Sequence, residues 1–169
     1  TVDTPGVTIT DSTASSATEG GYLRLASNDG AAMASGHRLG VIEFAGAEDA
    51  SATITVGARI EALTEALWTA SENGTSLLFY TTDANASQSE VLKLDSNKLA
   101  TFAGRIITTD TTEAASTTDG SLQTDGGLSV AKDCIFGNDV KLLTDSSVFS
   151  MGAGSDFTIT HDGTTGATL

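Results

Sequence analysis

The sequence has few basic residues, and that shortage excludes several kinds of partner. Lys and Arg number 8 against 22 Asp and Glu, which gives a formal net charge of −14 at pH 7. Nucleic acids are bound largely through Lys and Arg that displace counterions, and anionic membranes attract the same side chains. No apolar run approaches the ~20 residues of a membrane span. We therefore expect no nucleic-acid partner and no membrane insertion, with the acidity serving solubility.

Cysteine and histidine are nearly absent, which limits the chemistry of the chain. The single cysteine, Cys134, excludes an internal disulfide framework and a four-cysteine zinc site. It lies in a strand-like stretch, so we expect a buried, inert thiol. The two histidines, His37 and His161, lack a second histidine at metal-ligand spacing, and no serine sits in a Gly-x-Ser-x-Gly elbow. We predict no catalytic residue, no cofactor and no metal, and hydrogen bonding in a turn or between subunits for His37.

Acidic residues are abundant, and two functions for them stay open: glycoside hydrolysis and calcium binding. Glu43 and Glu61 could form a glycosidase pair if one sheet face held them ~5 to 9 Å apart. Glu48-Asp49 and residues 133–139 could offer oxygen ligands to calcium, although no EF-hand pattern is present. Solvated strand faces and turns are the commoner places for such acids, and turns are the interpretation that we prefer.

Large side chains are scarce as well. Aromatic residues make up 5% of the chain, which has 18 glycines and many Thr, Ser and Ala residues. Small side chains bury little apolar area, at roughly 25 cal/mol per Å². A single copy would struggle to offset the entropy of ordering such a chain. Identical neighbours would supply the missing burial, so the composition indicates an assembly.

Short strand patterns follow one another between residues 22 and 104. Turn signals such as Asn28-Asp29-Gly30 and Asn73-Gly74 separate them. The expected strands are 23–25, 39–44, 53–62 with a break at Gly57, 77–81 and 91–94. Regular spacing of this kind predicts an all-β, antiparallel, β-sandwich-like domain. Residues 58–70 also fit a helical stripe, but a strand followed by an irregular loop is preferred.

The flanking regions differ from this domain. Residues 1–21 are rich in Thr, Ser and Gly, contain the only proline, and are expected to form an extended linker or edge strand. Residues 105–169 show shorter expected strands at 128–130, 134–136, 140–142 and 157–160, separated by glycine turns. Such a pattern suits a narrow, glycine-rich shaft built from three chains. The chain begins and ends in mid-pattern, as expected for a processed product or part of a longer protein.

The larger side chains suggest a core and a binding surface. Six apolar strand residues are expected to supply the core: Val41, Ile42, Phe44, Ile60, Leu78 and Leu92. Buried core is also the more frequent fate of large aromatic rings. If Trp68 and Tyr80 are exposed instead, their rings could stack on sugars of a host surface glycan.

Two sets of short phrases follow one another along the chain. The first comprises LRL (23–25), GHRLGVIEF (36–44), GARIEA (57–62), WTA (68–70) and LFYTT (78–82). The second comprises TTDGSL (117–122), GGLSVAKD (126–133), LLTDS (142–146) and GSDFTITH (154–161). Together these phrases resemble tail-fibre and related virion structural proteins of phages, particularly marine ones. The resemblance implies a homotrimeric β-structured fibre on the exterior of the virion, in contact with other virion proteins and sometimes involved in host attachment.

The expected function is therefore that of a non-enzymatic structural subunit of a virion fibre or spike. Two other interpretations stay open. A capsid decoration protein could also be trimeric, acidic and β-rich, but it would bind a shell. A bacterial surface adhesin or filament subunit would share the composition and would carry a secretion signal in its full-length gene.

Overall fold

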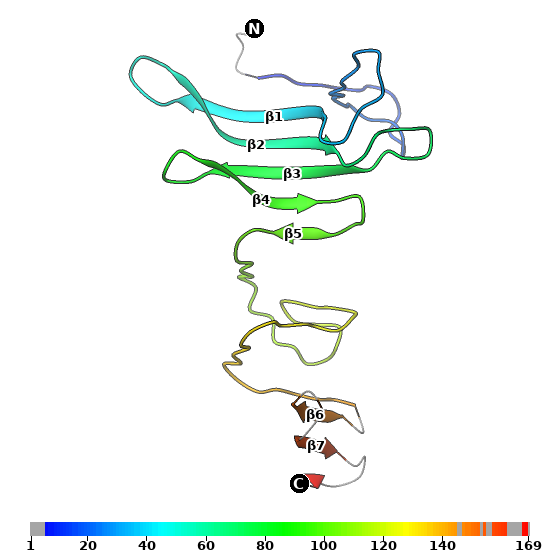
Figure 1. Cartoon of the computed structure of the whole chain (residues 1–169), viewed down its shortest axis with the longest axis vertical. Coiled ribbons are helices and arrows are strands. Elements are labelled where there is room, and N and C mark those ends of the chain that lie inside the picture. The colour runs from blue at the N-terminus through cyan, green and yellow to red at the C-terminus, as the bar shows by residue number, and fades with distance from the viewer. Residues whose placement is uncertain (1–5, 145–146, 153, 155–156, 162–166, 169) are drawn as a thin grey trace. The chain divides into compact units, whose positions relative to one another are not determined.

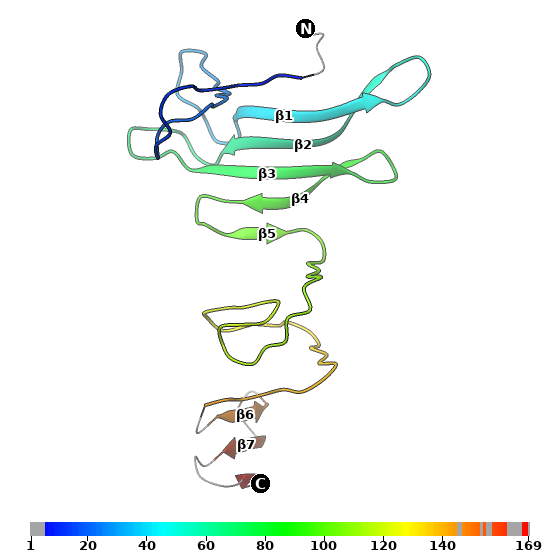
Figure 2. The same cartoon turned by 180° about the vertical axis from the view of Figure 1, so that it is seen from behind.

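A computed structural model describes residues 6–144, 147–152, 154, 157–161 and 167–168. Its contacts divide the chain into two compact units, Thr1–Thr109 and Asp110–Leu169. The described residues include eight strands and no helix, so the predicted all-β class is confirmed. Figures 1 and 2 show these strands from opposite sides.

The first unit contains one five-stranded antiparallel sheet in which each strand pairs with the next along the chain (Figure 1). The strands are β1 (Arg38–Ala47), β2 (Ile54–Thr64), β3 (Thr75–Thr82), β4 (Gln88–Leu94) and β5 (Ala100–Phe102). Residues 58–64 continue β2 and 65–70 form bends and irregular loop, so the preference for a strand over a helix there is confirmed. The described residues of this unit form a single sheet, which corrects the sandwich-like detail of the prediction.

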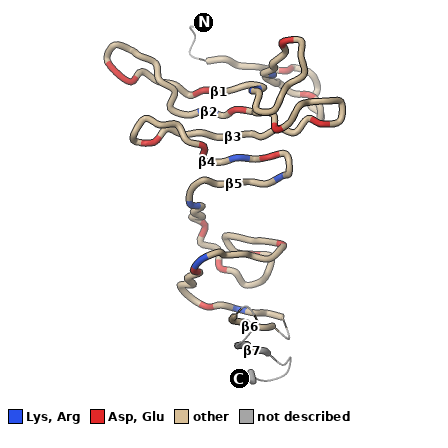
Figure 3. Tube along the Cα trace, in the orientation of Figure 1, with Lys and Arg blue, Asp and Glu red and all other residues tan. Residues whose placement is uncertain are grey.

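Three of the four hairpins in the described five-stranded sheet close in the same way, around an aspartate. Ala52, Ala86 and Lys98 have φ of 59°, 61° and 66°, and each donates its backbone N–H to the carbonyl of an aspartate three residues earlier. The carboxylates of Asp49, Asp83 and Asp95 each accept two further backbone N–H groups of the same turn. A type I turn followed by a left-handed residue is a common hairpin connection. Many of the acidic residues therefore lie in the loops (Figure 3).

The second unit has a smaller antiparallel sheet, made of β6 (Val148–Met151), β7 (Phe157–His161) and β8 (Ala167–Thr168). The expected strand at 157–160 is confirmed as β7. Four other expected strands, at 23–25, 128–130, 134–136 and 140–142, are wrong because these residues have no strand partner. Alternating side chains indicate a strand only where a neighbour supplies the hydrogen bonds.

Candidate functional site

Strand pairing places one large apolar residue from each strand of the first sheet in a single row. Ile42 pairs with Ile60, Ile60 with Phe79, Phe79 with Leu92, and Leu92 with Phe102. Directly opposed residues in an antiparallel sheet point to the same face. We call this set of five residues the apolar row.

A second row on the same face has smaller side chains at three of its five positions. It consists of Gly40, Ala62, Leu77, Leu94 and Ala100. A shallow groove of about 250 Å³ lies where Gly40 and Ala62 meet Ile42, Ile60 and Leu77. The two rows together form the apolar face.

The apolar face is largely open to solvent in the single chain. Ile42 and Phe102, at the two ends of the apolar row, keep 45% and 47% of their surface exposed, and Phe44 keeps 55%. Leu25 of the N-terminal segment covers one corner, since its Cβ lies 2.6 Å from where a Cβ on Gly40 would be. Of the six residues predicted to form the core, only Leu78 is buried within the chain. Within the single chain the other five are not buried, because Val41, Ile60 and Leu92 are half-buried, while Ile42 and Phe44 are exposed. Their burial between copies stays a prediction.

The opposite face is polar, and it holds the buried side chains. Glu61 is 3% exposed and lies between two guanidinium groups, 2.8 Å from Arg38 Nη2 and 3.3 Å from Arg59 Nη2. Leu78 lies beside it, because these two residues are a cross-strand pair. Long charged side chains can cover apolar surface with their stems. This face is therefore covered by the chain itself, whereas the apolar face is not.

Tyr80 belongs to the polar face, and its ring is occupied within the chain. The guanidinium of Arg59 lies 4.0 Å from the ring centroid, a cation–π distance. Burial, and next the charge of Glu61, raise the pKa of the Tyr80 phenol above its ordinary value. A sugar could reach only the ring face that Arg59 leaves free.

Trp68, the other predicted glycan contact, lies in the loop between β2 and β3 and is half-buried. Its Nε1 donates to the Gly74 carbonyl at 3.3 Å, and its backbone N–H donates to the Met33 carbonyl at 2.8 Å. Trp68 precedes β3, whereas Tyr80 lies near the end of that strand. The structure thus does not bring the two rings into one platform, and the glycan contact stays a prediction.

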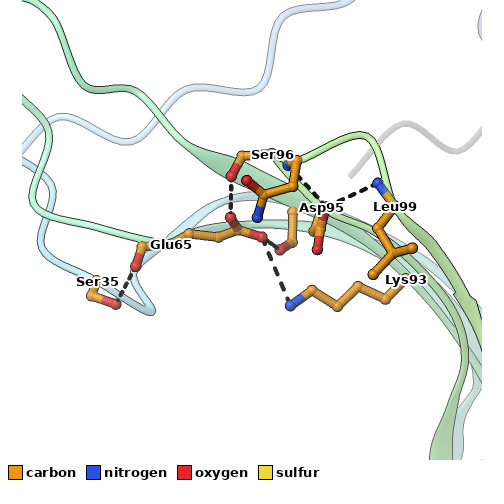
Figure 4. Close-up of polar contacts among 8 residues, drawn as sticks. Ser35, Glu65, Lys93, Asp95, Ser96 and Leu99 are labelled. Atoms are coloured by element: carbon orange, nitrogen blue, oxygen red, sulfur yellow. Dashed lines mark hydrogen bonds and ion pairs between the residues drawn. The ribbon is translucent and has the colours of Figure 1, made fainter.

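Sequence reasoning missed a polar cluster around Glu65, just after β2. The carboxylate of Glu65 accepts hydrogen bonds from the Ser76 and Ser96 hydroxyls and lies 3.7 Å from Lys93 Nζ (Figure 4). These hydroxyl groups, helped by the charge of Lys93, lower the pKa of Glu65. The Glu65 carbonyl accepts a hydrogen bond from the Ser35 hydroxyl at 2.8 Å. Because its donors come from β3, β4 and the turn after β4, no local sequence spacing could have revealed this cluster.

A polar groove of about 430 Å³ borders this cluster, lined by Glu65, Ser76, Lys93, Asp95 and Asn97 among others. Its acceptors already have partners within the chain. Asp95 accepts the backbone N–H groups of Asn97 and Leu99 at 2.9 and 3.0 Å. These hydrogen bonds accordingly link the loops at this end of the sheet to one another.

The other candidate residues whose side chains are described make contacts within turns and hairpins. His37 Nδ1 accepts a hydrogen bond from the Ala34 N–H at 3.3 Å, so the expected turn contact is confirmed. His161 lies in β7, and its side chain is outside the described residues. Glu48 and Asp49 bond to residues of their own hairpin. Within the described part of the chain, no group of three or more His, Cys, Asp and Glu residues could hold a metal ion.

Cys134 and residues 133–139 are exposed and outside any strand. The expectation of a buried thiol is therefore wrong. No described residue of the second unit is buried, and three of its large apolar side chains, Leu122, Leu128 and Ile135, are 70 to 92% exposed. A groove of about 490 Å³ in this unit is lined by residues 113–117 on one side, and by residues 138–139, 141–144 and Ser147 on the other.

Comparison with known proteins adds no family assignment. No protein-family model matches the chain, and no curated protein matches it. Among the described residues, no helix is both long and apolar enough to cross a membrane.

Proposed function

We propose that the chain is a structural subunit of a virion fibre or spike that assembles as a homotrimer and performs no catalysis. The observation that carries the proposal is the accessible surface of the single chain, 13875 Å². Such a subunit works by associating with its copies and with other virion proteins at the particle exterior. A contribution to attachment on a host surface glycan belongs to the same proposal.

That surface is larger than two compact folded units of these sizes would expose, which supports association. Compact units of the sizes of Thr1–Thr109 and Asp110–Leu169 would together expose about 9,300 Å². The difference, about 4,600 Å², is several times the ~800 Å² that one partner buries in a standard protein–protein interface. Association with further chains is the direct way to remove such an excess.

Three further observations support this function. The exposed apolar side chains of the second unit are those expected in a segment whose core lies between chains. The resemblance of the short phrases to phage fibre proteins covers both units. Finally, Glu61 of the alternative glycosidase pair is nearly inaccessible and engaged by Arg38 and Arg59, which supports a structural role for this carboxylate.

Light scattering on a sizing column tests the proposal directly. We expect a mass near three times the 17.1 kDa of one chain. A well-folded monomer would overturn the proposal. Antibodies against the chain should then label projecting fibres or spikes of purified particles in electron micrographs, whereas uniform labelling of the shell would favour a decoration protein.

The absence of catalysis has its own test. Purified chain incubated with capsular polysaccharides is expected to leave their size distribution unchanged. Depolymerisation that is lost on Glu43→Gln or Glu61→Gln would replace the structural proposal with an enzymatic one.

A further inference from the structure

The five-stranded sheet is covered on the unexpected side. An ordinary half-exposed sheet buries its apolar face and presents its polar face to water. Here the polar face contains the buried Glu61 and Leu78, and the apolar row remains open at both ends. An exposed, contiguous apolar surface of this kind marks an interaction site.

The charge distribution indicates what covers this face. Neither row contains a charged residue, and the adjoining set of Phe44, Ala58, Thr81 and Ser89 contains none. The chain as a whole carries a net charge of −14, so two copies repel each other wherever their acidic surfaces meet. A second copy can approach the apolar face without placing acid against acid. A basic partner, by contrast, would find no counter-charge there.

We infer that the apolar face is the contact surface between copies of this chain. This inference rests on the proposed function and adds the residues that make the contact.

Paired threonine variants of the full chain test the interface. Ile42→Thr with Phe102→Thr makes both ends of the apolar row polar and retains strand-compatible side chains. Both positions are exposed in the single chain, so far-UV circular dichroism should stay unchanged. The matched control is Leu67→Thr with Leu99→Thr, because these leucines are 58% and 59% exposed but lie in loops outside the face.

The native masses separate the possible outcomes. We expect the wild-type and control chains to have the trimer mass and the Ile42/Phe102 variant to have the mass of a folded monomer. A wild-type monomer would overturn the proposed function together with this inference. If the wild type and both variants are all trimeric, the inference is overturned while the proposed function stands.

A thiol-labelling measurement covers the case in which the variant fails to fold. In a Cys134→Ser background, Ile42→Cys and Leu99→Cys each introduce one thiol. In the native assembly we expect the thiol at 42 to react with an alkylating reagent at least about tenfold more slowly than the thiol at 99, because access controls the rate. Equal rates would show that the apolar face is open and would refute the interface.

Discussion

At the residue scale, carboxylates act as internal connectors of the first unit. Groups of the same chain donate hydrogen bonds to Glu65 and to the hairpin aspartates, and Arg59 forms an ion pair with Glu61. At Glu65 the hydrogen bonds from Ser76 and Ser96 favour the ionised carboxylate and lower its pKa. The abundance of acids therefore has structural consequences that a net charge does not express.

Glu65 is expected to make stability depend on acid pH. Its folded-state pKa lies below the ordinary value of 4.5, so its contribution is fully present above that value and is lost as the pH falls through the folded pKa. Thermal unfolding from pH 7 to pH 3 should show a larger loss for the wild type than for Glu65→Gln. Glu19→Gln, at an exposed carboxylate in the N-terminal segment, is the control and should follow the wild type. Parallel curves for wild type and Glu65→Gln would contradict the prediction.

Glu61 and Glu43 are expected to differ sharply although both lie on the polar face. Glu61→Gln leaves two guanidinium groups without their carboxylate and should lower the free energy of unfolding by about 1–2 kcal/mol. Glu43 is exposed, and Glu43→Gln should change it by less than about 0.5 kcal/mol. Urea unfolding of the two variants measures the difference. Equal losses would show that the Glu61 ion pairs do not stabilise the sheet.

At the scale of elements, three hairpins have the same type of turn, and each turn places a non-glycine residue at positive φ. A non-glycine residue in the left-handed region crowds its Cβ against the backbone, at a cost of about 1–2 kcal/mol. After allowing for the greater freedom of glycine in the unfolded chain, Ala86→Gly should stabilise the protein by about 0.5–1 kcal/mol. The control Ala84→Gly, in the same turn but without positive φ, should be neutral or destabilising. Chemical denaturation of both variants checks the sign.

The contact of the N-terminal segment with the sheet depends on Gly40. A Cβ at this position would lie 2.6 Å from the Cβ of Leu25, too close to be accommodated without displacement. Gly40→Ala should therefore release the segment around Leu25 and accelerate tryptic cleavage after Arg24 several-fold. Gly46→Ala, whose added Cβ would meet nothing within 4 Å, should leave the cleavage rate unchanged. An unaltered rate in Gly40→Ala would mean that Leu25 does not rest on the sheet.

At the scale of the whole molecule, assembly must overcome a net charge of −14 on every copy. An association through uncharged apolar faces gains nothing from ion pairs but suffers the long-range repulsion. Salt screens that repulsion, since the Debye length shortens from ~30 Å at 0.01 M to ~8 Å at 0.15 M. We expect the assembled fraction in sedimentation experiments to rise between these ionic strengths. A fall with added salt would indicate an interface held by ion pairs.

The sequence alone determined the all-β class, the order of the long strands and the preference for a strand at residues 58–64. Alternating patterns and turn signals are local, and β1 to β4 depend on them. It also indicated a deficit of burial, because small side chains limit the core of any single copy. The N-terminal and C-terminal stretches misled prediction, since short alternating runs need partners that local pattern cannot supply.

Only the tertiary structure decided which side chains meet. Register across five strands gathered Ile42, Ile60, Phe79, Leu92 and Phe102 into one row, and a shift by one residue would have turned each strand over. The same register buried Glu61 beneath two arginines and joined Glu65 to serines from distant segments. Composition records how much apolar surface a chain has, but pairing between strands decides on which face that surface lies. For this chain, pairing left the apolar face uncovered, and the inferred contact between copies follows from that placement.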